Sequence, residues 1–259
     1  MKKLLTICIP SIVERNKHLN RLLKELEKQI KENNCEKLIE IIVFVDNRDT
    51  PLYKKCNSLL NEVRGEYMVG LGDDDWIAPT YIKDIMDIVK IKVYDHITFN
   101  MVYRTDKKDK IMEFSHKYKH FSHVFPLNIS IRYGTYTKDE DCILYKNKKI
   151  IKNKFLIFVF LIIFKNFVKK STCPTWTTMV LKSDIAKQVK YEDVNSEEDM
   201  LWALTVSQKN LIKKEYNIKK NLYYYLYDKK FSSINKETVL VKEIDYVTQK
   251  IDKKIVKFI

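Results

Sequence analysis

Glycine and proline are scarce in this sequence, which holds four glycines and five prolines in 259 residues. This scarcity excludes collagen-like and linker-rich architectures. Intrinsic disorder is excluded as well, because 45% of the residues are hydrophobic and 32% are charged. A chain of this length can bury the core of one α/β domain. We therefore expect one folded domain over residues 1–259, with residues 229–259 as a C-terminal tail.

Cysteine pairs and long apolar segments are missing too. The five cysteines include no Cys-x-x-Cys pair, so neither a zinc ribbon nor a disulfide framework is indicated. The N-terminal apolar run breaks at Pro10 and meets Glu14 and Arg15, which favours a first strand over a cleaved leader. The ten apolar residues from Phe155 to Phe164 are too few to span a bilayer. We expect a cytoplasmic protein that is at most peripheral at a membrane.

Arginine is rare, although the formal net charge is +14. Of the 48 cationic residues six are arginine and the other 42 are lysine. A basic chain suggests an anionic partner, yet specific recognition of phosphates and bases favours the guanidinium group of arginine. The composition therefore favours compositional drift, in which the extra lysines only lie on a solvated surface. A functional basic face stays as the alternative.

Apolar runs and helical patterns alternate through the first half of the chain. Strands are predicted at residues 4–9, 38–45, 66–71 and 96–103, with helices at 19–30, 53–63 and 80–89 between them. The pattern predicts an α/β fold with a Rossmann-like, mostly parallel central sheet flanked by helices. Ligands of such folds bind at the carboxyl ends of the strands. Later signals are sparser: a strand at 177–181, a helix at 197–206 and a strand at 221–227.

Three of the four glycines, at positions 65, 70 and 72, precede the acidic run Asp73-Asp74-Asp75. Three consecutive carboxylates repel one another unless a cation or solvent screens them. Ligands that are all oxygen suit Mg²⁺ or Mn²⁺. A solvated acidic turn before the helix near Thr80 is the alternative, but the position after a buried strand favours a metal site.

Five separated segments resemble the nucleotide-sugar half of family 2 glycosyltransferases, which have the GT-A fold. These segments are residues 6–11 (TICIPS), 45–48 (VDNR), 55–60 (KCNSLL), 65–67 (GEY) and 72–75 (GDDD). They occur in the family's order, and the resemblance covers residues 4 to 103. It implies a metal-dependent, inverting transferase that uses Mn²⁺ or Mg²⁺ and moves a sugar from a nucleotide-diphosphate donor to an acceptor hydroxyl.

The resemblance also implies roles for individual residues. In that family the Pro-Ser turn and the Asp after the second strand hold the nucleoside, the Lys-x-Asn element lies near the base or diphosphate, and an Asp-x-Asp element holds the metal. The residues so implied are Pro10, Ser11, Asp46, Lys55, Asn57 and Asp74 for the donor, and Asp73 and Asp75 for the metal. Because Gly72 stands where many relatives carry a fourth acid, it stays open which aspartates contact the metal and which contacts the ribose.

The second half, residues 105–228, is expected to bind the acceptor and supply the base. Residues 196–202 (SEEDMLW) resemble the family's base-bearing element and imply Asp199 as the general base, with Glu198 near the acceptor. Trp176 resembles an acceptor-side residue that stacks on a sugar. For residues 196–199 the alternative is that Ser196 and the acids cap a helix. For Trp176 the alternative is a tryptophan buried in the core. Processive synthases of the family carry a Gln/Arg-x-x-Arg-Trp element, and none follows Asp199. The resemblance therefore implies transfer of a single sugar.

Other functions compete with this interpretation. A sugar-phosphate nucleotidyltransferase usually has a glycine-rich loop after its first strand, and this chain has Pro10-Ser11 there. A basic nucleic-acid or membrane-binding module would leave the acidic run unexplained, because that run repels phosphate. The spacing of His116, His120 and His123 invites a zinc site, but no cysteine joins them, and we expect a solvated surface.

The segment from Lys146 to Lys170 carries eight lysines and no acid around its apolar run. It suggests peripheral contact with an anionic membrane, where a lipid-linked or membrane-proximal acceptor would reach the site. The alternative is a buried helix or strand of the acceptor half. Unbroken apolarity favours burial, because an interfacial helix is typically apolar on one face only.

Overall fold

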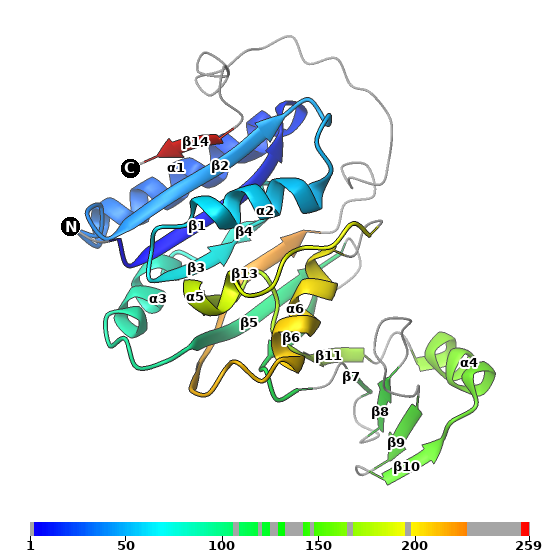
Figure 1. The fold of residues 1–259 in the computed structure, drawn as a ribbon. Helices are drawn as coiled ribbons and strands as arrows, with labels where there is room; N and C mark the ends of the chain where they lie inside the picture. Colours follow the sequence, from blue (N-terminus) through cyan, green and yellow to red (C-terminus); the bar gives the residue numbers. More distant parts are fainter. Residues whose placement is uncertain are drawn as a thin grey trace.

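The first half of the chain alternates strands and helices as its pattern predicts (Figure 1). The computed structural model describes residues 3–105, 109–118, 121–124, 129–132, 142–145, 148–164, 168–194, 198–226 and 255–258. Its first elements are β1 (Leu5–Ile12), the 3₁₀ turn η1 (Val13–Arg15), α1 (Asn16–Glu32), β2 (Ile39–Asp46), α2 (Leu52–Glu62), β3 (Tyr67–Gly70), β4 (Trp76–Ile77), α3 (Tyr81–Val89) and β5 (His96–Arg104).

The second half contains more strands than its sequence pattern revealed. They are β6 (Asp109–Phe114), β7 (Phe121–Val124), β8 (Ile129–Arg132), β9 (Cys142–Tyr145), β10 (Lys148–Ile151), β11 (Val168–Cys173), β12 (Val180–Lys182), β13 (Glu215–Leu226) and β14 (Ile255–Phe258). The helices are α4 (Lys154–Phe164), α5 (Ser183–Ala186) and α6 (Glu198–Gln208).

The central sheet is built around three parallel strands, with β1 between β2 and β3. On one side β14 adds to β2 in the antiparallel sense, and on the other β12 lies antiparallel between β3 and β5. β13 runs parallel to β5 and also pairs with β4. The predicted α/β fold, a central sheet flanked by helices, is confirmed. β12 overlaps the strand predicted at 177–181, but its antiparallel direction was not predicted, and neither was β14.

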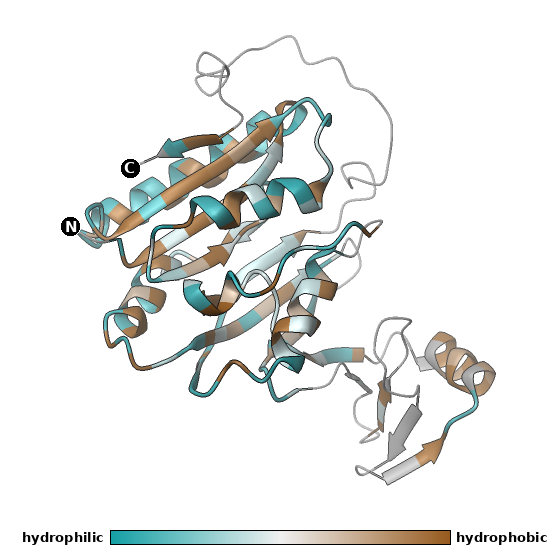
Figure 2. Cartoon of the chain, in the orientation of Figure 1, coloured by the Kyte–Doolittle hydropathy of each residue, from teal (hydrophilic) through white to brown (hydrophobic). Residues whose placement is uncertain are grey.

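Alternate residues of the central strands face opposite sides of the sheet, as the two-residue period of a strand requires. Ile9 and Val43 belong to one buried cluster, which contains the apolar faces of α1 and α3. Cys8 and Ile42, one position earlier, belong to a second cluster with residues of α2 and α6. Burial on both faces explains why these strands are continuous apolar runs, which Figure 2 shows in brown.

An outlying layer of β7, β8, β9 and β10 with α4 extends from the main sheet through β11 (Figure 1). Its own small cluster joins Ile131, Ile157 and Val168. The expectation that residues 155–164 are buried is wrong for much of α4, since the Phe155 side chain is 70% exposed. Within the described residues, no helix has the length and apolarity needed to cross a membrane.

A buried acid holds the amino-terminal ends of the central strands together. The Glu40 carboxylate accepts hydrogen bonds from the Thr6 hydroxyl at 2.7 Å and the Arg64 amide at 2.9 Å. Burial raises the pKa of Glu40, but the bonds from Arg64 and Thr6 outweigh it and leave the pKa below its ordinary value. Gly65 then donates its amide to the Thr6 hydroxyl at 2.8 Å. A Cβ at Gly65 would lie 2.6 Å from the Thr6 nitrogen, so only glycine fits.

We predict that Gly65→Ala destabilises the fold by about 1–3 kcal/mol, because the added methyl meets backbone that cannot move independently of the sheet. Urea denaturation measures the change in the free energy of unfolding. The control is Asn61→Ala on the exposed face of α2, which should change it by less than about 0.5 kcal/mol. Equal stability of the two variants would contradict the packing described for Gly65.

Candidate functional site

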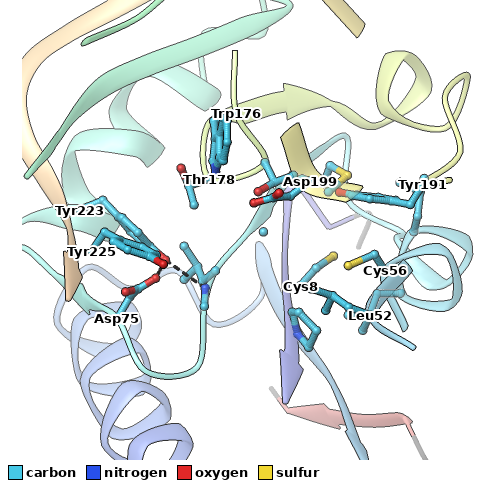
Figure 3. Close-up of a pocket in the computed structure, with 18 of the residues that line it drawn as sticks. Cys8, Leu52, Cys56, Asp75, Trp176, Thr178, Tyr191, Asp199, Tyr223 and Tyr225 are labelled. Carbon is cyan, nitrogen blue, oxygen red and sulfur yellow. Dashed lines mark hydrogen bonds between the residues drawn. The ribbon is translucent and has the colours of Figure 1, made fainter. Parts of the chain in front are cut away.

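A cavity of about 180 Å³ lies at the carboxyl ends of β1 and β3, where the fold places its ligands (Figure 3). Both halves of the chain line it. Its walls include Pro10, Asp74, Asp75, Trp176, Asp199 and Tyr223. The structure therefore brings together, around one cavity, acids and aromatic residues that are distant in the sequence, such as Asp74 and Tyr223, which are 149 positions apart.

Asp73 lies beside this cavity and does not line it. Its side chain is 2% exposed, and both carboxylate oxygens are engaged. The Ser11 hydroxyl donates to one at 2.6 Å, and the Arg15 guanidinium donates to the other at 2.9 Å. Burial raises the pKa of Asp73, Arg15 opposes that rise, and neighbouring Asp74 adds to it. Asp73 therefore ties the acidic loop to the end of β1.

Asp74 and Asp75 are the two aspartates that face the cavity. Arg15 also pairs with Asp74, at 3.1 Å. The Tyr223 hydroxyl donates to Asp75, and the Leu226 amide donates to it at 3.2 Å. Burial, reinforced by the charge of Asp74, raises the pKa of Asp75 to about 7. Asp75 is buried and the neighbouring Asp74 side chain is 27% exposed, so little water screens the two acids, and a bound proton or a cation is favoured between them.

Because Gly72 has no side chain, it leaves space for the carboxylates of Asp74 and Asp75. A Cβ at Gly72 would lie 2.5 Å from an Asp75 carboxylate oxygen and 3.3 Å from one of Asp74. Its amide donates to the Tyr223 hydroxyl at 3.0 Å, the same hydroxyl that donates to Asp75. Carboxylates that converge beside a glycine, with oxygen as the ligand atom, fit Mg²⁺ or Mn²⁺.

Of the residues predicted to hold the donor, Pro10 lines the cavity, whereas Ser11, Asp46 and Lys55 do not line it and bond to one another. The Asp46 carboxylate accepts from the Lys55 ammonium and from the backbone amides of Arg48 at 3.1 Å and Thr50 at 2.9 Å. Lys55 also donates to the Ser11 carbonyl at 2.9 Å. This ion pair is almost fully buried and fastens β2 and α2 to the end of β1.

Asn57 is engaged elsewhere. Its side-chain amide donates to the Tyr191 carbonyl at 2.8 Å and accepts from the Tyr191 amide at 2.9 Å. The pair joins α2 to the loop before α6, and the Tyr191 ring stacks on Trp202 with centroids 5.1 Å apart. Asn57 thus supports the cavity wall to which Tyr191 belongs.

The residues predicted to lie on the acceptor side are opposite the acidic loop. Figure 3 shows Trp176 and Asp199 across the cavity from Asp75 and Tyr223. Gly70 donates its amide to the Thr177 carbonyl at 2.9 Å, which fixes the Trp176 loop against the end of β3. Glu198 is 6% exposed, and among the described residues one of its carboxylate oxygens has no hydrogen-bond partner. Ser196 and Glu197 lie outside the described residues.

Sequence reasoning missed Arg15 and Tyr223, which position the acidic loop. Arg15 follows β1 and is 58 positions from Asp73, and Tyr223 is one of three consecutive tyrosines in β13. Nothing in their local sequence distinguishes them from surface residues. An available signal was the rarity of arginine: Arg15 and Arg21 both contact this loop, Arg21 through the carbonyls of Asp74 and Asp75 at 3.0 and 2.6 Å.

A second network, around Glu215, was also missed. Its carboxylate accepts from Ser115 at 2.5 Å, contacts the Nδ1 atoms of His96 and His116 at 2.8 Å each, and accepts the His116 amide at 2.9 Å. His96 Nε2 lies 2.5 Å from the Thr175 hydroxyl, next to Trp176. The expectation of a solvated histidine is wrong for His116, which is 13% exposed. Its predicted companions lie outside the described side chains.

His96, His116 and Glu215 also have the composition of a metal site, because their ligand atoms lie within 4.8 Å of one another. The hydrogen bonds just described already occupy those atoms. The arrangement therefore needs no ion, and it serves to hold the Trp176 loop on the start of β5 and β13.

Comparisons with known proteins bear on the fold. No protein-family model matches the chain, and no curated protein matches it significantly. Residues 1–349 of Staphylococcus aureus TarS, a glycosyltransferase, match with a TM-score of 0.50 and 15% identity, over 86% of this chain and 60% of that one. The same protein in complex with UDP-GlcNAc matches at 0.49 and 15%, over 87% and 59%. This chain thus spans about three fifths of those chains, and the likeness shows the fold.

A more distant match is a CMP-2-keto-3-deoxy-manno-octonic acid synthetase complexed with CTP. It has a TM-score of 0.34 and 8% identity, over 84% of this chain and 90% of that one. A similarity this low carries no argument for a nucleotidyltransferase.

We predict that Glu215→Gln weakens the acid sensitivity of the fold. Burial raises the pKa of Glu215, but its bond with His96, the His96 charge and the Ser115 hydroxyl together lower it from 4.5 to about 2. A carboxylate with a lowered pKa stabilises the fold above pH 4.5, and this contribution is lost as the pH falls through about 2. Burial lowers the pKa of His96, so His96 also makes the fold less stable as the pH falls.

Denaturation curves from neutral pH down into this window measure the effect. Wild type and the exposed control Glu36→Gln should lose stability in parallel as the pH falls, and Glu215→Gln should lose less. Parallel curves for all three proteins would show that Glu215 does not contribute as its contacts indicate.

Proposed function

We propose that this chain is a glycosyltransferase that moves a sugar from a nucleotide-diphosphate donor to an acceptor hydroxyl. One observation carries the proposal: two neighbouring aspartates, the half-buried Asp74 and the buried Asp75, line the same cavity as a third carboxylate, Asp199, at the carboxyl ends of parallel strands, and Asp75 and Asp199 lie on opposite walls (Figure 3). Such a pair of acidic groups on opposite walls suits a donor diphosphate held on one side and an acceptor hydroxyl on the other. The fold shared with TarS is consistent with this assignment.

Asp74 and Asp75 are the residues proposed to hold Mn²⁺ or Mg²⁺. When bound, the ion would neutralise charge that develops on the departing nucleotide. Asp73 is proposed as a positioning residue, because Ser11 and Arg15 already occupy its oxygens. This choice among the three aspartates departs from the sequence-based pairing of Asp73 with Asp75.

Pro10 borders the donor site, and Ser11, Asp46 and Lys55 hold its wall in place. On the other wall, Asp199 is proposed to remove the proton of the acceptor hydroxyl as that oxygen attacks the sugar carbon. The nucleotide leaves from the opposite face of the sugar, so a single displacement inverts the configuration. Trp176 offers an aromatic face for the acceptor, and Glu198 lies one residue before the base.

The cellular setting stays a prediction. Cys8, Cys35, Cys56 and Cys173 form no disulfide in the described part of the chain. UDP-GlcNAc is the first donor to test, because it was bound in the structure of TarS.

We predict that Asp199→Asn retains nucleotide binding and loses transfer by about 10²–10⁴-fold, the usual contribution of a general base. Calorimetry measures binding of UDP and of UDP-GlcNAc, and radiolabelled sugar measures transfer. The control is Glu192→Gln, an exposed acid in the segment that precedes α6, which should transfer at the wild-type rate. Wild-type transfer by Asp199→Asn would mean that another group takes the proton.

We also predict that EDTA abolishes transfer and that Mn²⁺ or Mg²⁺ restores it. Asp75→Asn should raise the concentration of Mn²⁺ needed for half-maximal transfer by about 100-fold. Even residues that only support metal ligands contribute about 10–100-fold to metal affinity. Asp73→Asn should raise this concentration less, because the role of Asp73 is to hold the loop. Full turnover in EDTA would remove the metal from the proposal, and a larger effect at Asp73 than at Asp75 would reverse the assignment.

A further inference from the structure

The helix α4 is well formed although it lies in the outlying layer. The Asn153 side chain accepts hydrogen bonds from the amides of Phe155 at 2.9 Å and Leu156 at 3.2 Å, as an N-cap does. The first helical bond runs from the Ile157 amide to the Asn153 carbonyl at 3.0 Å. The exposure of its side chains is therefore a property of a capped, regular helix.

Both faces of α4 are apolar (Figure 2). Ile157 is fully buried and packs with Ile131 and Val168. Five large apolar side chains are about half exposed or more: Phe155 70%, Leu156 49%, Phe158 48%, Ile162 51% and Ile163 59%. At 3.6 residues per turn these five fall within an arc of about 160° centred opposite Ile157. One face thus serves the small cluster, and the other is an exposed apolar surface of the kind that marks an interaction site.

The residues around this face decide what it binds. The segment 146–170 holds eight lysines and no acid, and Lys152 and Lys169 next to α4 are exposed. Apolar side chains whose adjoining sequence, residues 146–170, supplies cations and no acid complement a lipid surface with anionic headgroups. A second copy of the chain fits less well, because packing two such faces together would bring lysine against lysine with no acid in either segment.

We propose that the exposed face of α4 inserts shallowly into the surface of an anionic lipid bilayer. β11 connects this layer directly to the Trp176 loop on the cavity wall. If the proposed function holds, the membrane lies on the acceptor side and the acceptor is lipid-linked or membrane-proximal. Membrane binding itself does not depend on transfer, so each can fail while the other stands.

Co-sedimentation of the full chain with vesicles tests the proposal. We expect binding to vesicles of phosphatidylserine and phosphatidylcholine, weaker binding to phosphatidylcholine alone, and release by salt. The double variant Phe155→Asp/Leu156→Asp should lower the vesicle partition coefficient by about tenfold or more, since it places charge in the apolar face. Both changes lie in the first helical turn, where acids favour the helix dipole, so the helix should persist.

The matched control is Ile91→Asp/Val93→Asp, which puts the same two charges on side chains that are 52% and 44% exposed beyond the end of α3, an element well away from α4 (Figure 1). It should bind vesicles as wild type does. A charge variant, Lys152→Glu/Lys169→Glu, leaves the apolar face intact and should lose the preference for anionic lipid. Thermal unfolding confirms that each variant is folded.

Three results would overturn the proposal. The first is no binding of wild type to anionic vesicles, and the second is equal binding by wild type and Phe155→Asp/Leu156→Asp. The third is self-association in the ultracentrifuge that the same double variant abolishes, without vesicle binding, which would assign the face to a second copy of the chain.

Discussion

Three consecutive aspartates at the end of a buried strand are the constraint on which the rest of the site depends. Their mutual repulsion must be offset where water cannot do so. Arg15 pairs with Asp73 and Asp74, and Arg21 binds the carbonyls of the loop while its guanidinium lies 4.3 Å from the centre of the Trp76 ring. The side chains that compensate the loop thus come from η1 and α1, immediately after β1.

The same loop ties the two halves of the molecule together. Tyr223 and Leu226 reach Asp75 from β13, which also pairs with β4 and β5. Because β13 follows α6 in the chain, the strand that holds Asp75 belongs to the part of the molecule that carries Asp199. The cavity walls that carry Asp75 and Asp199 are therefore fixed relative to each other by one strand, and also by the Gly70–Thr177 bond.

Much of the fold follows from patterns that are local in the sequence. The seven elements predicted between residues 4 and 103 correspond to β1, α1, β2, α2, β3, α3 and β5, because burial on both sides of a sheet produces continuous apolar runs. β6 escaped prediction because only its last residue is buried, and β7 to β10 escaped it because each is only four residues long, too short for a clear pattern. The antiparallel direction of β12 is a tertiary property that no local pattern carries.

The candidate site divides in the same way. Asp75, Trp176 and Asp199 were identified from motifs, and the structure places them around one cavity. Asp73 and Asn57 were identified too, but their side chains face partners in the protein, Arg15 and Tyr191, which are distant in the sequence. Arg15, Tyr223 and Glu215 act only through such distant contacts, so a single sequence offers no pattern that marks them.

The most direct test of the account is the position of manganese in crystals grown with Mn²⁺ and UDP. Anomalous scattering locates the ion independently of any activity. The account predicts Mn²⁺ in contact with the carboxylates of Asp74 and Asp75 on the cavity side, next to the diphosphate. Nucleotide bound there without metal, or Mn²⁺ found only at His96, His116 and Glu215, would contradict it.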